Sequence, residues 1–275
     1  MIPAPFGYVR ATSSDEALAA LASHGDEAKL LAGGHSLLPL MKLRLATPAV
    51  LVDVGRVPDL GYIRVEGDEV AIGALARHRD IERSAELRAA CPVLGHVAGQ
   101  VGDPQVRARG TLGGSLAHGD AASDLPAAVL ALDGTLVVDG PRGRREVAAR
   151  EFFVGFLETA LEPDEMLVEV RVPVTGDAGW SYQKFTRRAQ DWAVVGAVAV
   201  ARGDGAAGAL VNMGSRPLRA DAVEQALADG ATAADASGLA AAGTEPSADL
   251  HASTDYRRHL ARVLTGRALV AAGVA

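Results

Sequence analysis

The chain has 275 residues, of which 49% are hydrophobic and 22% charged, a composition typical of a folded globular protein. Its formal net charge of -7 argues against a nucleic-acid or anionic-membrane surface, because such surfaces need clustered Lys and Arg. The single cysteine, Cys91, excludes an internal disulfide and a self-contained iron–sulfur cluster, which needs about four thiolates.

The first part of the chain predicts alternating helix and strand. Ser13 or Ser14 is a typical N-cap before the acidic and apolar segment that runs to about Ser23, so we expect a helix there. A strand over 28–32 leads into a glycine pair, a short helical turn follows within 37–45, and a second strand covers 49–54. This alternation is typical of an α/β start.

The middle of the chain predicts a mixture of hairpins and helices. We expect hairpins over 62–72 and 135–147, helices over 79–89, 93–101 and 125–132, and a strand over 166–172. The Gly- and Asp-rich connection 175–179 indicates a domain boundary. Beyond it we expect strands over 180–185, 193–201 and 209–213, and helices over 220–227 and 256–270.

Two glycine pairs carry the strongest functional signal. They lie in Ala32-Gly33-Gly34-His35-Ser36 and in Thr111-Leu112-Gly113-Gly114-Ser115. Consecutive glycines let backbone N–H groups converge on an anion, so two such turns can hold the two ends of one pyrophosphate. Neither has the spacing of a Walker loop or of the Rossmann fingerprint. Ordinary tight turns remain the alternative for both.

These segments, together with Phe6-Gly7-Tyr8, Asp103-Pro104-Gln105-Val106-Arg107, Asp191-Trp192-Ala193 and Asp255-Tyr256-Arg257, resemble the FAD-binding medium subunit of molybdenum hydroxylases, the carbon monoxide dehydrogenase and xanthine dehydrogenase family. The resemblance covers almost the whole chain. It implies an α+β fold: a two-subdomain FAD-binding fold of the vanillyl-alcohol oxidase type, followed by a C-terminal three-stranded sheet with helices. The expected domains are 1–175, with subdomains of about 1–57 and 58–175, and 176–275.

The resemblance also implies which residues hold a non-covalently bound FAD. One phosphate would lie against Ala32, Gly33, Gly34, His35, Ser36 and Leu37, and the other against Thr111, Gly113, Gly114 and Ser115. Asp124 is similar to the family Asp that accepts hydrogen bonds from cofactor hydroxyls. His118 is similar to a family residue near the flavin or ribityl chain, Trp192 to an aromatic ring over the isoalloxazine, and Lys184 would face the polar edge of the flavin.

Simpler interpretations of these side chains stay open. His35 and His118 can equally well pack within the protein, and Asp124 can cap the helix that starts at Leu125 and Pro126. Trp192 can belong to the core of the C-terminal domain, and a lone Lys on a strand, such as Lys184, commonly faces solvent.

The function implied by the resemblance is electron transfer within an oxidoreductase complex. Electrons would pass from a large molybdenum-binding subunit through the [2Fe-2S] clusters of a small subunit to FAD here, and then to an external acceptor. No residue of this chain need act as a catalytic acid, base or nucleophile, and none is expected to bind a metal. A cytoplasmic heterohexamer, a dimer of heterotrimers, is expected, with no integral membrane segment. The alternatives are a self-sufficient flavin oxidoreductase and a non-catalytic FAD-binding module.

Overall fold

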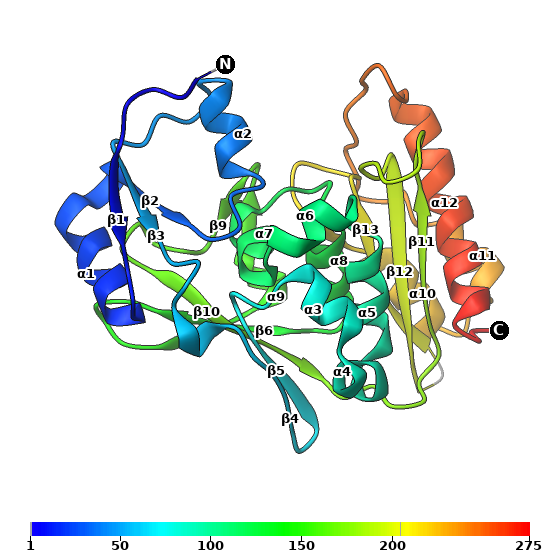
Figure 1. Ribbon diagram of the computed structural model, residues 1–275. Helices are drawn as coiled ribbons and strands as arrows, with labels where there is room; N and C mark the ends of the chain where they lie inside the picture. The colour runs from blue at the N-terminus through cyan, green and yellow to red at the C-terminus, as the bar shows by residue number, and fades with distance from the viewer. Residues whose placement is uncertain (1, 204) are drawn as a thin grey trace.

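The computed structural model describes residues 2–203 and 205–275. Its N-terminal part is a small parallel sheet with strand order β1-β3-β2, at the left of Figure 1. The elements here are β1 (Gly7–Arg10), α1 (Ser14–His24), η1 (Gly25–Glu27), β2 (Ala28–Leu31), α2 (Leu37–Lys42), β3 (Val50–Asp53) and η2 (Pro58–Leu60). The predicted α/β start is confirmed, but β1 was not anticipated.

Local capping explains why α1 forms where the sequence predicts it. The Ser13 hydroxyl accepts a hydrogen bond from the backbone N–H of Glu16 at 3.2 Å, and Gly25 ends the helix with φ of 52°. A cap of this kind contributes about 1 kcal/mol.

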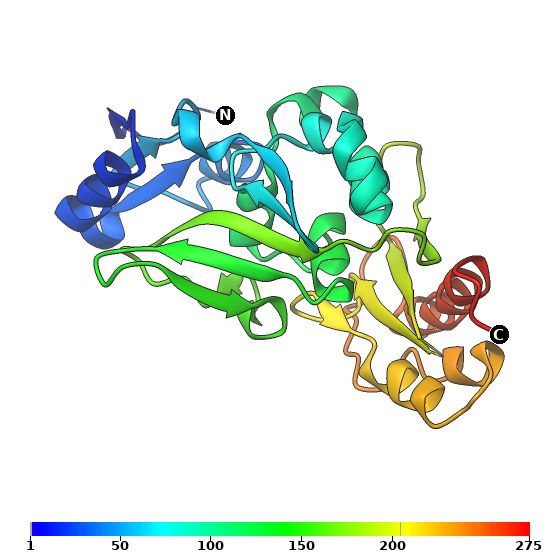
Figure 2. The same cartoon turned by 90° about the horizontal axis from the view of Figure 1, so that it is seen from below.

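The middle of the chain forms an antiparallel sheet with strand order β4-β5-β10-β6-β7. Figure 2 shows its long strands running beneath the helices that follow β5. Its strands are β4 (Ile63–Glu66), β5 (Glu69–Gly73), β6 (Thr135–Asp139), β7 (Arg145–Ala148) and β10 (Met166–Pro173), and β8 (Phe153–Gly155) pairs with β9 (Glu158–Thr159) in a separate hairpin. Both predicted hairpins are confirmed.

The predicted helices over 93–101 and 125–132 are present in this middle part, within two residues of the expected bounds. Its helices are α3 (His78–Arg83), α4 (Ala85–Ala90), α5 (Pro92–Gly99), α6 (Pro104–Arg109), α7 (Leu112–His118), α8 (Asp124–Ala131) and α9 (Ala149–Phe152). The prediction of one helix over 79–89 is wrong. Ser84 has extended backbone angles and caps α4 by accepting from Leu87 N–H at 3.0 Å, which divides the segment in two.

The C-terminal part is a sheet with strand order β11-β12-β13-β14, covered by α12 at the right of Figure 1. Its elements are β11 (Trp180–Phe185), β12 (Val195–Arg202), β13 (Gly205–Val211), β14 (Leu218–Arg219), α10 (Asp221–Ala228), α11 (Ala233–Ser237) and α12 (Thr254–Ala271). The three predicted strands are present, and the two-residue strand β14 adds a fourth. No helix in the described ranges is long and apolar enough to cross a membrane.

Helix α8 joins the middle and C-terminal parts. Every residue of α8 is buried, and it packs against α5 on one side and against β12 and β13 on the other. One apolar cluster therefore extends from Leu125 and Val129 to Val198 and Val211 of the C-terminal sheet. Burying apolar surface contributes about 25 cal/mol per Å², so this shared cluster holds the middle and C-terminal parts together.

An ionic cluster beside α8 reinforces this junction. Asp133, at φ of 51°, accepts hydrogen bonds from Arg202 and Arg219 of the C-terminal sheet and pairs with Arg150 at 3.3 Å. Burial alone would raise the pKa of Asp133, but the hydrogen bond from Arg202 and the charge of Arg219 outweigh it and lower that pKa. The two parts are thus linked by charge as well as by apolar packing.

Candidate cofactor site

The first glycine segment connects β2 to α2 and leaves several backbone donors free. Gly34 has φ of 76°, which only glycine adopts readily, whereas Gly33 does not have a positive φ. No backbone acceptor among the described residues pairs with the N–H groups of Gly33, Gly34, His35 or Ser36. Four neighbouring N–H groups without backbone partners form a site suited to an anion.

The second glycine segment is not a turn, which corrects the prediction from the sequence. Thr111 is the N-cap of α7, so Gly113 and Gly114 lie in the first turn of a helix. The Gly113 N–H donates to the Ala74 carbonyl at 2.9 Å, and the Gly114 N–H to the Thr111 hydroxyl oxygen at 3.1 Å. These N–H groups are therefore already paired, and the segment presents the Thr111 and Ser115 side chains to the adjoining cleft.

Close packing explains the glycines that have no positive φ. A Cβ on Gly33 would lie 2.2 Å from the Arg109 carbonyl oxygen, and a Cβ on Gly113 would lie 2.5 Å from the Ala74 Cβ. Real Cβ atoms essentially never come that close to another atom. Gly33 therefore lets the first segment touch the Arg109–Gly110 backbone that leads into α7, so the two glycine segments lie side by side.

Both segments line one cleft of about 770 Å³, which lies among the N-terminal sheet, the middle sheet and β11. This volume is within the range of about 300–1,000 Å³ that is usual for ligand sites. The cleft brings together every residue selected from the sequence: Ala32, Gly33, Gly34, His35, Ser36, Leu37, Thr111, Gly113, Gly114, Ser115, His118, Asp124, Lys184 and Trp192.

A buried ion pair forms part of the cleft wall. Lys184 Nζ lies 2.8 Å from Asp124 Oδ2 and donates to the Gln100 carbonyl at 2.9 Å, while the Tyr182 hydroxyl donates to Asp124 Oδ1. Burial raises the pKa of Asp124, an effect that the nearby Lys184 charge opposes. Burial and the Asp124 charge both raise the pKa of Tyr182.

Two of the open interpretations do not hold. Asp124 is not the N-cap of α8, because Ser123 occupies that position and Asp124 is the first residue of the helix. Lys184 does not face solvent, because its side chain is only 8% exposed. Asp124 begins α8 and Lys184 lies on β11, so the pair joins the middle and C-terminal parts of the molecule at the cleft wall.

Trp192 lies at the mouth of the cleft and is 58% exposed, so it is not a core residue. It lies two residues after Gln190, whose φ is 62°, and its own N–H donates to the Asp191 carboxylate at 2.9 Å. An indole in this position presents a large flat surface to whatever enters the cleft.

The sequence did not indicate two parts of the wall. One is the segment from Leu157 to Leu167, which carries Glu158 and Glu162 into the cleft and contains no recognisable motif. The other is His78, whose place beside the cleft depends on a contact with Gly110 that no local pattern reveals.

Comparison with known proteins agrees with this architecture. Residues 4–175 match the family described as FAD binding domain in molybdopterin dehydrogenase, and residues 180–272 match the CO dehydrogenase flavoprotein C-terminal domain. The chain is 43% identical to the carbon monoxide dehydrogenase medium chain of Hydrogenophaga pseudoflava, over 99% of this chain and 98% of that protein. It is 37% identical to the 6-hydroxypseudooxynicotine dehydrogenase complex subunit alpha of Paenarthrobacter nicotinovorans, over 99% and 96%.

Solved structures of related enzymes have the same fold over nearly the whole chain. A carbon monoxide dehydrogenase structure from Hydrogenophaga pseudoflava, lacking the Mo-pyranopterin moiety of the molybdenum cofactor, superposes with a TM-score of 0.96 at 43% identity, covering 99% of both chains. Quinoline 2-oxidoreductase from Pseudomonas putida 86 superposes with a TM-score of 0.91 at 35% identity, again covering 99% of both chains.

Proposed function

The chain belongs to the family of FAD-binding medium subunits of molybdenum hydroxylases, and we propose that it passes electrons from iron–sulfur clusters of a partner subunit to an external acceptor. The observation that carries this proposal is the single cleft that both glycine segments line. The first segment offers free N–H groups there, and the second offers hydroxyl groups. A dinucleotide needs such a site at its pyrophosphate.

The residues that line the cleft suit FAD chemically. Unpaired N–H groups at Gly33 to Ser36 suit a phosphate, and the Cβ-free surface at Gly33 permits the close approach of the two segments. Lys184 and the exposed Trp192 lie on the β11 side of the cleft and suit a flat, polar-edged ring. We therefore propose that the fourteen residues named above hold the cofactor non-covalently.

In this proposal the protein binds and orients the flavin, and the flavin supplies the redox chemistry, which proceeds in one- or two-electron steps. The first glycine segment binds phosphate, Thr111 and Ser115 donate hydroxyl hydrogen bonds, and Asp124 fixes the Lys184 ammonium group in the cleft wall. Trp192 limits the access of water to the ring. None of these residues transfers a proton to or from a substrate.

We propose a large molybdenum-binding subunit and a small iron–sulfur subunit as partners, in a dimer of heterotrimers. The carbon monoxide dehydrogenase and quinoline 2-oxidoreductase names of the similar proteins support this. The single Cys91 supports it too, because an iron–sulfur cluster needs about four thiolates.

We also propose that the chain divides into domains 1–175 and 176–275, the first with subdomains of about 1–57 and 58–175. One family match ends at residue 175 and the other begins at residue 180, which supports the main boundary.

The isolated chain, loaded with FAD, should not oxidise any substrate of the complex, although dithionite should reduce its flavin. Carbon monoxide, a purine, an aldehyde and an N-heterocycle would be assayed with a dye acceptor, for the chain alone and for the complex purified from its source. We expect turnover of at least one compound by the complex only. Turnover by the lone chain would contradict the subunit proposal and favour a self-sufficient flavin oxidoreductase. FAD binding with no turnover by either preparation would favour a non-catalytic module.

Replacing Trp192 by alanine should leave most FAD bound while exposing the ring to solvent. Aromatic stacking contributes about 0.5–1.5 kcal/mol beyond area burial, so we expect the FAD Kd to rise by roughly 2- to 13-fold. Flavin fluorescence and the rate of reoxidation by oxygen should both change. The Trp192→Phe variant keeps a ring and serves as the matched control. Unchanged fluorescence and an unchanged reoxidation rate in Trp192→Ala would show that Trp192 does not contact the flavin.

A further inference from the structure

His78 is a buried histidine in the cleft wall to which the proposed function assigns no role. It begins α3, its backbone N–H donates to the Gly110 carbonyl at 3.0 Å, and its side chain lines the cleft although the residue is only 4% exposed. A buried imidazole costs free energy unless its polar atoms find partners. A ligand that accepts a hydrogen bond from this ring would offset part of that cost.

The ring lies against the junction of the two glycine segments. A Cβ on Gly110 would be 2.8 Å from His78 Nε2 and 2.7 Å from Cδ2, so the absence of that Cβ makes room for the ring. A Cβ on Gly33 would in turn be 3.0 Å from the Gly110 Cα. His78, Gly110 and Gly33 are thus in successive contact, which places the imidazole where the first segment meets the second.

The two ring nitrogens have different surroundings. Nδ1 is fully buried and has no hydrogen-bond partner among the described residues, whereas Nε2 is not among the buried unpartnered atoms. No described residue pairs with Nε2 either, and Nε2 lies beside Gly110, where the two glycine segments meet at the cleft. Burial, with smaller effects from His35 and Arg107, lowers the pKa of His78 to about 4, so the ring is neutral at physiological pH.

A neutral imidazole carries its proton on one nitrogen only. A proton on Nδ1 would bury an unpaired N–H donor, which native structures strongly avoid. A proton on Nε2 leaves only a lone pair unsatisfied at Nδ1. The geometry therefore favours the Nε2–H tautomer, which places a donor beside Gly110, at the junction of the two glycine segments.

We propose that His78 is a further ligand of the cofactor, with its Nε2–H donating a hydrogen bond to a phosphate oxygen of the FAD pyrophosphate. This inference rests on the proposed function. A neutral donor suits the site because Lys and Arg are missing from both glycine segments, so dipoles and hydrogen bonds meet the phosphate charge there. The bond needs no change in the charge of the protein.

The test uses three variants of the protein, purified with any subunits that accompany it and stripped of FAD. His78→Met removes the donor, and His78→Gln, of nearly the same shape, restores an amide N–H close to the place of Nε2. In His78→Asn the side chain is one carbon shorter than in Gln, so its amide N–H lies only at the place of Nδ1. FAD titration should give a Kd 10- to 100-fold higher for Met and for Asn than for the wild type, with Gln recovering most of the loss. That range corresponds to about 1.4–2.8 kcal/mol.

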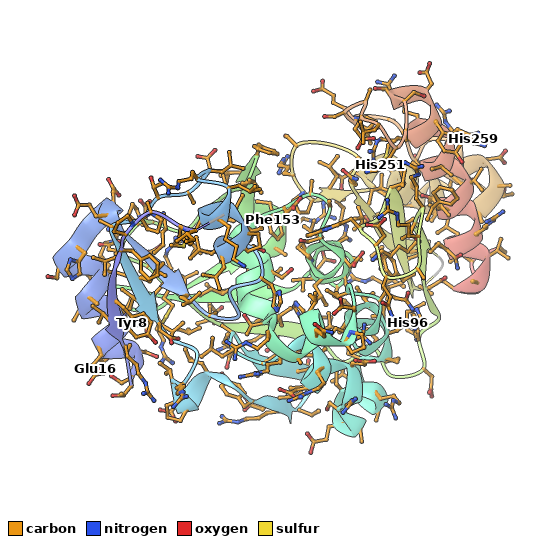
Figure 3. The ribbon with its side chains drawn as sticks, turned by 45° about the horizontal axis from the view of Figure 1, so that its top comes forward. Tyr8, Glu16, His96, Phe153, His251 and His259 are labelled. Atoms are coloured by element: carbon orange, nitrogen blue, oxygen red, sulfur yellow. The ribbon has the colours of Figure 1, made fainter. Side chains whose placement is uncertain are left out.

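His96→Phe is the matched control, because His96 lies on α5 (Figure 3) and does not line the cleft. Its ring centroid lies 5.2 Å from that of Trp180. The FAD Kd of His96→Phe should equal that of the wild type. A His78→Met Kd within twofold of the wild type would overturn the proposal. So would rescue by Asn and not by Gln, or equal losses of affinity in all three variants in step with their thermal stability, which would mark a purely structural role. Failure of the wild type itself to bind FAD would contradict the proposed function instead.

Discussion

Replacing Gly33 by valine should abolish FAD binding. The new Cβ would lie 2.2 Å from the Arg109 carbonyl oxygen, so the first glycine segment must move away from Gly110. The free N–H groups of the segment would then no longer lie beside Thr111, and the two ends of the pyrophosphate site would separate. We expect no flavin to copurify with this variant and no saturable binding in titration.

Loss of the fold would not explain this result. Overpacking costs about 1–3 kcal/mol, whereas a domain is stable by about 5–15 kcal/mol, so the variant should fold with a reduced Tm. Circular dichroism checks this. The Gly61→Val variant is the matched control, because a Cβ there meets no atom within 4 Å and Gly61 has φ of -115°. Gly33→Val protein that keeps full flavin occupancy would remove the first segment from the cofactor site.

Replacing Lys184 by methionine should destabilise the protein by about 3–5 kcal/mol, because it leaves the Asp124 carboxylate buried with only the Tyr182 hydroxyl as a partner. The loss should depend on pH. Burial already raises the pKa of Asp124, and removing the Lys184 charge raises it further. A group with a raised folded-state pKa contributes stability below its unfolded pKa and loses it as pH rises through the folded one. The deficit should therefore be smaller at pH 5 than at pH 8.

Urea unfolding of the wild type and the variant at both pH values measures this deficit. The double variant Lys184→Met, Asp124→Asn has no buried unpaired charge, so it should regain much of the lost stability and show little additional dependence on pH. A single variant as stable as the wild type at pH 8 would show that the pair contributes no net stability. A deficit that grows toward pH 5 would show that the carboxylate, not the carboxylic acid, is the favoured form of Asp124.

Local signals explain which parts of the fold the sequence predicts correctly. The Ser13 cap with its acidic first turn marks α1, and Gly67, at φ of 66°, permits the tight turn between β4 and β5. Alternating apolar residues mark β10, whose buried and partly exposed positions alternate in its second half. Each of these features depends on residues only a few positions apart.

The error in the second glycine segment arises because glycine has more than one possible use. Gly34 is the left-handed turn residue that the sequence suggested, but Gly113 is needed for close contact with Ala74 inside a helix that Thr111 caps. A glycine pair alone does not distinguish the two uses, because the neighbour of Gly113 lies about 40 positions away in the sequence.

In the cofactor site too, the sequence predicts which residues take part but not the contacts between residues that lie far apart in the chain. The resemblance to a known family selected fourteen residues, and all of them line one cleft. The pairing of Lys184 with Asp124 spans 60 positions and the contact of His78 with Gly110 spans about 30, so neither leaves a local pattern. These contacts follow from the packing of α8, β11 and α3 around the cleft.

Release of the cofactor from the protein purified from its source tests most directly whether this chain holds FAD as the flavin subunit of a molybdenum hydroxylase. Acid precipitation followed by chromatography and mass measurement of the supernatant would identify and count the flavin, and metal analysis would be done on the same sample. We predict one intact FAD per chain in the supernatant, with molybdenum and iron in the accompanying subunits. A preparation without flavin, or flavin that stays with the precipitated polypeptide, would contradict non-covalent FAD binding by this chain.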